Sequence, residues 1–149
     1  MTSEKLSAAC HCGSVVFTVQ LSDGLHTARR CNCSFCRMRG AVAVSAPLSG
    51  IKVLKGQDKL TEYRFNTGKA VHFFCSVCGI YTFHQRRSNP DQYGVNVACI
   101  ENMSPFDFAC VEVNDGVTHP SDGGSSGVVG YLRYKPKKSP PVETGGKNI

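Results

Sequence analysis

Cysteine is the residue type whose number and spacing in this chain point most directly to chemistry. Seven of the nine cysteines stand in three short groups. The groups are Cys10 with Cys12, then Cys31, Cys33 and Cys36, then Cys75 with Cys78. Sulfurs at such spacings can bind one metal ion together. The first residues lack the layout of a secretory signal and the cysteine count is odd, so we expect metal ligands in a reducing compartment rather than disulfides.

Cys75 and Cys78 have the spacing of a zinc-binding turn, Cys-x-x-Cys followed by Gly79. In such a turn two sulfurs reach the same ion and backbone amides point toward them. Zinc prefers four ligands in a tetrahedron, so this pair needs two more, and Cys10 with Cys12 can supply them. We predict that these four residues, the four-cysteine cluster, form a closed structural zinc site that contributes directly to folding.

The remaining group, Cys31, Cys33 and Cys36, offers three thiolates within six residues. Three ligands leave one zinc position for solvent or substrate, so we predict that this three-cysteine cluster holds a catalytic zinc. Two alternatives stay open: all seven cysteines share one cluster, or some of them are buried apolar side chains. Cys99 and Cys110 lie in apolar, strand-like segments, where a buried thiol is the expected occupant.

Four arginines flank the three-cysteine cluster, with Arg29 and Arg30 before it and Arg37 and Arg39 after it. We predict that Arg37 and Arg39 bind the carboxylates of an anionic co-substrate, and the alternative is a solvated basic loop. His84 becomes a candidate proton carrier only if its strand passes the cluster. The other histidines are expected to be structural or exposed.

Short β-strands are predicted along most of the chain, because segments rich in β-branched and aromatic residues alternate with turn residues. The predicted strands are residues 14–20, 41–46, 51–54, 60–65, 70–74, 80–84, 94–100 and 110–113, with an edge strand at 130–134. Turn residues interrupt every periodic segment before it reaches ordinary helix length. We therefore predict an all-β, or β-dominated, fold.

Length and charge restrict the classes of protein to consider. The 149 residues suffice for one domain, expected over residues 1–135, with a disordered tail at 136–149. The net charge of +6, from 17 lysines and arginines against 11 acidic residues, favours anionic partners. Nucleic acid is the weaker choice, because the chain has no tryptophan and its lysine-rich segment is confined to the tail. No apolar run is long enough to cross a membrane, and we expect a cytoplasmic protein.

The order CHCG, CNCSFC and FCSVCG, at residues 10–13, 31–36 and 74–79, resembles the family that groups glutathione-dependent formaldehyde-activating enzyme with centromere protein V. The resemblance covers about residues 7–115. It implies a fold of several coiled antiparallel β-sheets, stapled by zinc and shared with methionine sulfoxide reductase B and a Rab-binding zinc protein. It also implies that the four-cysteine cluster holds the structural zinc and the three-cysteine cluster the catalytic one.

The same resemblance implies an activity. The thiol of glutathione adds to formaldehyde and gives S-hydroxymethylglutathione, a detoxifying reaction classed as a carbon–sulfur lyase step. We therefore expect two zinc ions as cofactors and a small-molecule thiol and aldehyde as partners. One alternative is a non-catalytic zinc module that binds chromatin, nucleic acid or protein. Another is thiol chemistry at Cys99, which is disfavoured because methionine sulfoxide reductase B binds zinc through two Cys-x-x-Cys turns and this chain has only one clean turn of that kind, Cys75 to Cys78.

Overall fold

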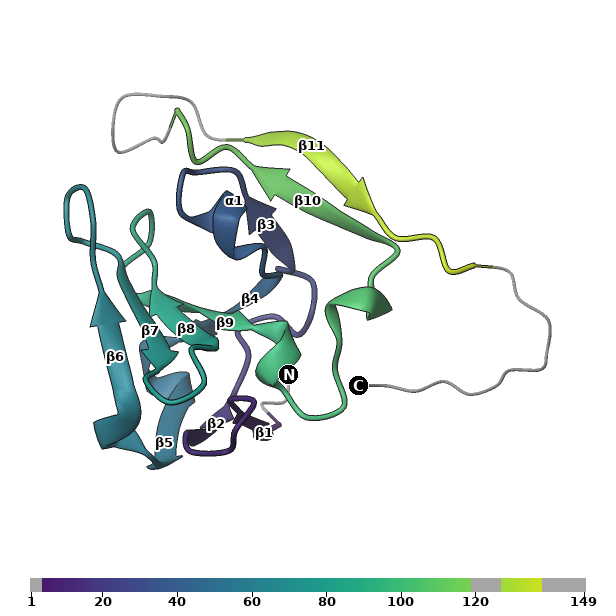
Figure 1. Ribbon diagram of the computed structural model, residues 1–149. Helices are drawn as coiled ribbons and strands as arrows, with labels where there is room; N and C mark the ends of the chain where they lie inside the picture. The colour runs from purple at the N-terminus through teal and green to yellow at the C-terminus, as the bar shows by residue number, and fades with distance from the viewer. Residues whose placement is uncertain (1–3, 119–126, 138–149) are drawn as a thin grey trace.

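The computed structural model describes residues 4–118 and 127–137. Strands dominate this part of the chain and form two sheets, of three and eight strands, with short helical turns between them (Figure 1). The prediction of a strand-dominated fold is confirmed, and every predicted strand overlaps a strand of the structure. Within the described ranges no helix is long and apolar enough to span a membrane. Most of the predicted tail, from residue 138 on, lies outside the described residues.

The smaller sheet consists of β1 (Leu6–Ala9), β2 (Val16–Val19) and β5 (Ile51–Lys55), joined in the order β1-β2-β5 by antiparallel pairs. β2 alternates half-buried and buried residues, with Phe17 and Val19 fully buried, because successive side chains of a strand point to opposite faces. β1 was not predicted. Its residues LSAA have weak strand propensity, and pairing with β2 is what makes it a strand.

The larger sheet has the strand order β11-β10-β3-β4-β9-β8-β7-β6. Its strands are β3 (Arg29–Cys31), β4 (Ala43–Pro47), β6 (Leu60–Tyr63), β7 (Val71–Cys75), β8 (Tyr81–Gln85), β9 (Gln92–Asn96), β10 (Cys110–Asn114) and β11 (Val128–Arg133). Neighbouring strands are antiparallel except β3 and β10, which run parallel. This pair places Asn114, at the end of β10, opposite Cys31, the first residue of the three-cysteine cluster.

Short helical elements connect the strands. They are α1 (Cys36–Arg39), η1 (Leu48–Gly50), η2 (Gln57–Lys59), η3 (Val97–Cys99) and η4 (Pro105–Asp107). The predicted strand at residues 94–100 was too long, because β9 ends at Asn96 and η3 follows. The Asn96 side chain accepts a hydrogen bond from the Ala98 backbone N–H at 3.0 Å, which caps this turn and ends the extended segment.

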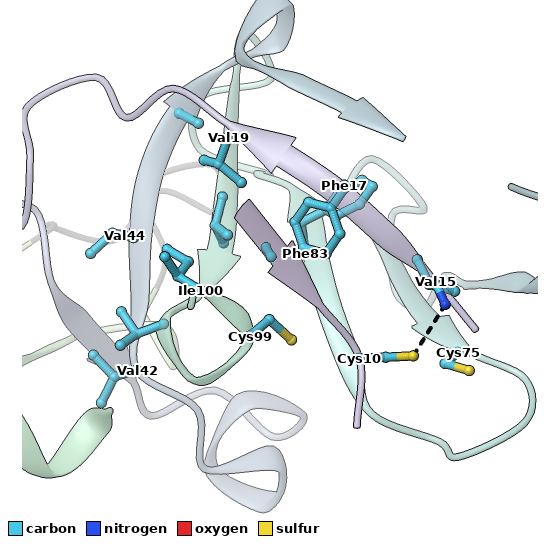
Figure 2. Close-up of a cluster of buried hydrophobic side chains, with 14 of the residues drawn as sticks. Cys10, Val15, Phe17, Val19, Val42, Val44, Cys75, Phe83, Cys99 and Ile100 are labelled. Carbon is cyan, nitrogen blue, oxygen red and sulfur yellow. Dashed lines mark hydrogen bonds between the residues drawn. The ribbon is translucent and has the colours of Figure 1, made fainter. Parts of the chain in front are cut away.

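The hydrophobic core contains residues of both sheets (Figure 2). Phe17 of β2 packs against Phe83 of β8, with ring centroids 5.3 Å apart. Burying an aliphatic or aromatic side chain in this way stabilises the fold by about 1.5–3 kcal/mol. Cys10 and Cys75 belong to the same buried group, and the Val15 backbone N–H donates to Cys10 Sγ. The four-cysteine cluster is therefore anchored in the core.

Candidate active site

The four-cysteine cluster joins two turns that are far apart in the sequence. Cys10 and Cys12 lie between β1 and β2, Cys75 ends β7, and Cys78 lies in the turn between β7 and β8. The Sγ–Sγ distance is 3.7 Å from Cys10 to Cys12 and 3.8 Å from Cys12 to Cys75, and the four sulfurs all lie within 4.8 Å of one another. The structure thus brings together the four residues that the sequence analysis grouped.

This arrangement fits a zinc ion. Tetrahedral zinc with Zn–S distances of about 2.3 Å needs sulfurs about 3.8 Å apart, as the cluster has them. Backbone N–H groups of Val15 and Val77 donate to the sulfurs of Cys10 and Cys75, each at 3.3 Å. Such hydrogen bonds orient the ligands and stabilise thiolates. Four thiolate donors at these distances match a closed, structural zinc site.

The three-cysteine cluster is built from one short segment. Cys31 ends β3, Cys36 begins α1, and Cys33 lies between them. Their sulfurs lie within 4.8 Å of one another, and in the described part of the chain no further cysteine, histidine or carboxylate joins this group. The Cys33 and Cys36 backbone N–H groups donate to the sulfurs of Cys31 and Cys33, at 3.4 Å and 3.3 Å. Three thiolate donors fit a zinc ion that keeps one coordination position for another ligand.

Hydrogen bonds among these three sulfurs separate their pKa values. Hydrogen bonding with Cys31 and Cys36 lowers the pKa of Cys33, whereas hydrogen bonding with Cys33 raises the pKa of Cys31, and hydrogen bonding with Cys31 and next with Cys33 raises the pKa of Cys36. Without a metal, Cys33 is therefore the cysteine of this cluster that loses its proton most readily. A metal ion that binds all three sulfurs has to displace the remaining protons, so its affinity falls as the pH falls.

A cavity of about 730 Å³ lies beside the three-cysteine cluster, whose residues form part of its wall. Much of the remaining wall comes from the segments that follow β6, β8 and β10, which gather at the same end of the molecule as α1 (Figure 1). Six arginines line it: Arg29, Arg30, Arg37, Arg39, Arg86 and Arg87. Among the described residues of the wall, Asp115 is the only carboxylate. The cavity is therefore electropositive and suits a small anionic ligand.

The family model described as glutathione-dependent formaldehyde-activating enzyme matches residues 5–111, a stretch that contains both clusters. The chain belongs to this family. A crystal structure of a Rhodobacter sphaeroides protein is also similar, with 53% sequence identity and a TM-score of 0.71. The similarity covers 72% of this chain and 99% of that one. The cavity at the three-cysteine cluster is the candidate active site, because three thiols and six arginines line it.

In this formaldehyde-activating family member, Arg39 contacts the three-cysteine cluster directly. Its Nη2 lies 3.4 Å from Cys36 Sγ, and its Nη1 lies 2.9 Å from His72 Nδ1. The guanidinium also lies over the Tyr81 ring, 3.7 Å from the centroid. These contacts hold a positive charge beside Cys36 and favour its thiolate. Arg37, by contrast, is exposed on the wall of the cavity.

Two further arginines are fixed in the cavity wall through Ser45. Arg29 Nη1 donates to the Ser45 hydroxyl at 3.2 Å and to the Ala43 carbonyl at 3.3 Å, and Arg86 Nη1 donates to the same hydroxyl at 3.3 Å. Burial, and next the nearby charge of Arg86, lower the pKa of Arg29 to about 10. Arg29 therefore keeps its charge at neutral pH, and the pair forms a fixed positive surface.

His72 lines the cavity and carries a buried hydrogen-bond donor. Because arginine only donates, His72 Nδ1 must accept from Arg39, and the ring proton is on Nε2. Burial, and next the charge of Arg39, lower the pKa of His72 to about 4, so the ring is neutral at neutral pH. Only 4% of His72 is exposed, and within residues 4–118 and 127–137 its Nε2 has no hydrogen-bond partner. A buried donor without a partner is a candidate to bind a ligand or an ordered water.

His84 stacks on His72, with ring centroids 5.0 Å apart, and also lines the cavity. Its Nδ1 lies 2.7 Å from the Tyr81 hydroxyl, which donates to the Gly94 carbonyl at 3.1 Å. Since a hydroxyl has one proton, His84 Nδ1 donates to Tyr81 and leaves Nε2 as an acceptor. Burial lowers the pKa of His84 well below its usual value. His84 thus lines the same cavity as the three-cysteine cluster, and its role as a proton carrier stays a prediction.

The two remaining cysteines lie outside both clusters. Cys99 is buried, its Sγ donates to the Tyr81 carbonyl at 3.4 Å, and burial raises its pKa to about 12, which disfavours thiol chemistry there. Cys110 is exposed, so the expectation that it is buried was wrong. The sequence analysis also missed His72. Its neighbours in VHFF are those of an ordinary buried strand, and no sequence signal marks its contact with Arg39.

Proposed function

We propose that this chain is a zinc-dependent enzyme that forms and breaks a carbon–sulfur bond between a thiol and an aldehyde. One observation carries the proposal: a three-cysteine cluster, with no fourth side-chain ligand among the described residues, lines an arginine-rich cavity. Family membership supports glutathione as the thiol and formaldehyde as the aldehyde. The product is S-hydroxymethylglutathione, and the reverse reaction is the lyase step.

The two clusters take different roles in this proposal. Cys31, Cys33 and Cys36 hold the catalytic zinc, and the four-cysteine cluster holds the structural one. When bound to three thiolates, zinc can accept a thiol as a fourth ligand and stabilise it as the thiolate. Three cysteine thiolates outweigh the charge of one zinc ion, and Arg39 offsets this excess through its contact with Cys36 Sγ.

The arginines of the cavity supply affinity for the thiol substrate. Glutathione carries two carboxylates, and arginine binds a carboxylate through two parallel N–H donors. We propose that Arg37, which is exposed on the cavity wall, binds one of these carboxylates. Arg39 contributes mainly its charge, because both of its Nη groups already contact protein atoms.

We propose that His72 donates a hydrogen bond to the aldehyde oxygen. As the thiolate sulfur attacks the carbonyl carbon, the carbon–sulfur bond forms and the π electron pair moves to the oxygen. The Nε2–H of neutral His72 can donate to this oxygen while it gains negative charge. The proton that the thiol released then completes the hydroxyl group of the product. Arg39 keeps His72 in the donating tautomer by occupying its Nδ1.

We also propose that the protein has one catalytic domain and is cytoplasmic. Residues 1–135 would act as one catalytic domain, followed by the tail at 136–149. All nine cysteines are free of disulfides in the structure. Free cysteines in this number suit the reducing cytoplasm, where glutathione keeps thiols reduced.

A titration of cobalt-loaded protein with glutathione tests the proposal. We expect the thiolate-to-cobalt absorption to change as glutathione binds, and the change to be lost in Cys33→Ser. Cys110→Ser, at an exposed cysteine outside both clusters, is the matched control and should behave as the wild type. NMR exchange between labelled formaldehyde and its glutathione adduct should then be accelerated only by proteins that bind glutathione. Full cobalt loading without any response to glutathione would contradict the proposal and favour a non-catalytic zinc module.

A further inference from the structure

The β10–β11 hairpin lies almost wholly beyond residue 111, where the match to the family ends, yet it contributes to the cavity. Gly116 and Val117 follow β10, Val128 begins β11, and all three line the cavity wall. Figure 1 shows the end of β10 and the start of β11 near β3 and α1. A segment outside the family match therefore forms part of the candidate active site.

Hydrogen bonds join the end of β10 to the segment that carries the cysteines. The parallel pair between β3 and β10 places Asn114 opposite Cys31. The Asn32 backbone N–H donates to the Asn114 carbonyl at 3.2 Å, and the Asn32 side chain accepts from the Gly116 backbone N–H at 2.7 Å. Asn32 thus uses its backbone and its side chain to hold the turn after β10 against the three-cysteine cluster.

Gly116 approaches two cysteines so closely that a side chain would not fit. A Cβ atom at this position would lie 2.4 Å from Cys31 Sγ and 2.8 Å from Cys33 Cβ, both well inside van der Waals contact. The φ angle of Gly116 is not in the positive range, so the backbone conformation alone would accept alanine. The requirement for glycine therefore comes from the cysteines and not from the turn.

We propose that Gly116 is a positioning residue for the metal ligands: its bare backbone holds Cys31 and Cys33 where their sulfurs can share one ion with Cys36. The β10–β11 hairpin is then a working part of the reactive site, although it lies outside the family match. This inference rests on the part of the proposed function that assigns a metal to the three-cysteine cluster. It does not depend on the identity of the thiol or of the aldehyde.

The expected effect is selective because the two clusters are far apart in the fold. The contacts of Gly116 are with Asn32, Cys31 and Cys33, whereas the four-cysteine cluster lies between the β1–β2 and β7–β8 turns. A methyl group at position 116 should displace Cys31 Sγ and leave the other cluster intact. The four-cysteine cluster is therefore an internal control for correct folding.

Metal content and cobalt spectra of Gly116→Ala test the inference, with Gly130→Ala as the matched control. Gly130 lies in the same hairpin, and a Cβ there would meet no atom within 4 Å. We expect two metal ions per chain in the wild type and in Gly130→Ala. Gly116→Ala should hold one, with the loss of the cobalt signal that responds to added thiol and a thermal unfolding midpoint close to that of Gly130→Ala.

Three outcomes would overturn the inference. Two metal ions and an unchanged cobalt spectrum in Gly116→Ala would show that the cluster tolerates the methyl group. Loss of both ions would show that Gly116 serves folding as a whole, and a single ion in the wild type would remove the site itself. If the wild type holds two ions but does not respond to glutathione, the proposed function fails while this inference stands.

Discussion

The two cysteine clusters share their ligand chemistry and differ in how the chain builds them. In both, backbone N–H groups donate to the sulfurs. Cys12 and Cys75, which lie 3.8 Å apart in the four-cysteine cluster, are separated by 63 positions in the sequence. The three-cysteine cluster comes from residues 31–36 alone. A metal in the first cluster closes a long loop between two sheets, whereas a metal in the second fixes a single turn.

The two clusters also differ in their surroundings. Cys10 and Cys75 belong to the hydrophobic core, although Cys12 is exposed, and four sulfurs are enough to complete the coordination of a zinc ion. The cysteines of the three-cysteine cluster are half-buried and line a cavity rich in arginine. Ligand number, sequence separation and surroundings therefore agree in separating a site that stabilises the fold from one that can meet a substrate.

The largest expected effect comes from removing one ligand from each cluster. Cys75→Ser should abolish cooperative unfolding and the binding of both metals, because a structural zinc site contributes on the order of 10 kcal/mol to folding. Cys33→Ser should keep a cooperative transition and one metal ion per chain. Thermal unfolding followed by circular dichroism, together with metal analysis, measures both. A folded Cys75→Ser protein beside an unfolded Cys33→Ser protein would reverse the assigned roles.

A smaller effect should appear on acidification, on the side of the molecule that holds the three-cysteine cluster. The pKa of His72 is about 4 in the folded protein against 6.5 as its ordinary value. Between these pH values the unfolded chain binds a proton that the folded chain does not. The unfolding free energy should therefore fall as the pH drops from 6.5 toward 4, by about 3 kcal/mol from this residue.

Denaturant unfolding of His72→Gln across this pH range checks the prediction. Glutamine cannot take up the proton, so the variant should lose less stability than the wild type on acidification. His26→Gln, at an exposed histidine, is the control and should follow the wild-type curve. Metal content is measured in parallel, because His72→Gln removes a partner of Arg39, which contacts Cys36 Sγ. Parallel curves for His72→Gln and the wild type would contradict the prediction.

The spacing of the cysteines was sufficient to predict both clusters, because their ligands occur in short turns. Cys75 and Cys78 close a turn before Gly79, and residues 31–36 bring three sulfurs together locally. Most strands were also predictable, since the alternation of apolar and polar residues over four to six positions indicates a strand with one buried face. The exceptions are β1 and β3, which depend on pairing with other strands rather than on their own residues.

Contacts between segments that are distant in the chain could not be predicted from the sequence. His72 meets Arg39 across 33 positions, and Gly116 meets Asn32 across 84. Both contacts depend on strand order, and the contact of Gly116 depends on the parallel pair of β3 with β10 in an otherwise antiparallel sheet. A glycine after a strand reads as an ordinary turn residue, so its approach to the cysteines has no sequence signal.

The smallest expected effect separates two arginines that the sequence treated as equivalent. Arg39 contacts Cys36 Sγ at 3.4 Å, whereas Arg37 is exposed. Arg39→Gln should weaken the binding of any thiol to the cobalt-loaded three-cysteine cluster about tenfold, since a hydrogen bond to a charged group contributes about 1.5 kcal/mol. Arg37→Gln should weaken only thiols that carry carboxylates. Absorption titrations with glutathione and with 2-mercaptoethanol, which has no carboxylate, distinguish the two. If Arg39→Gln leaves 2-mercaptoethanol binding unchanged, Arg39 binds carboxylates as Arg37 does, and the charge of the thiolates is balanced elsewhere.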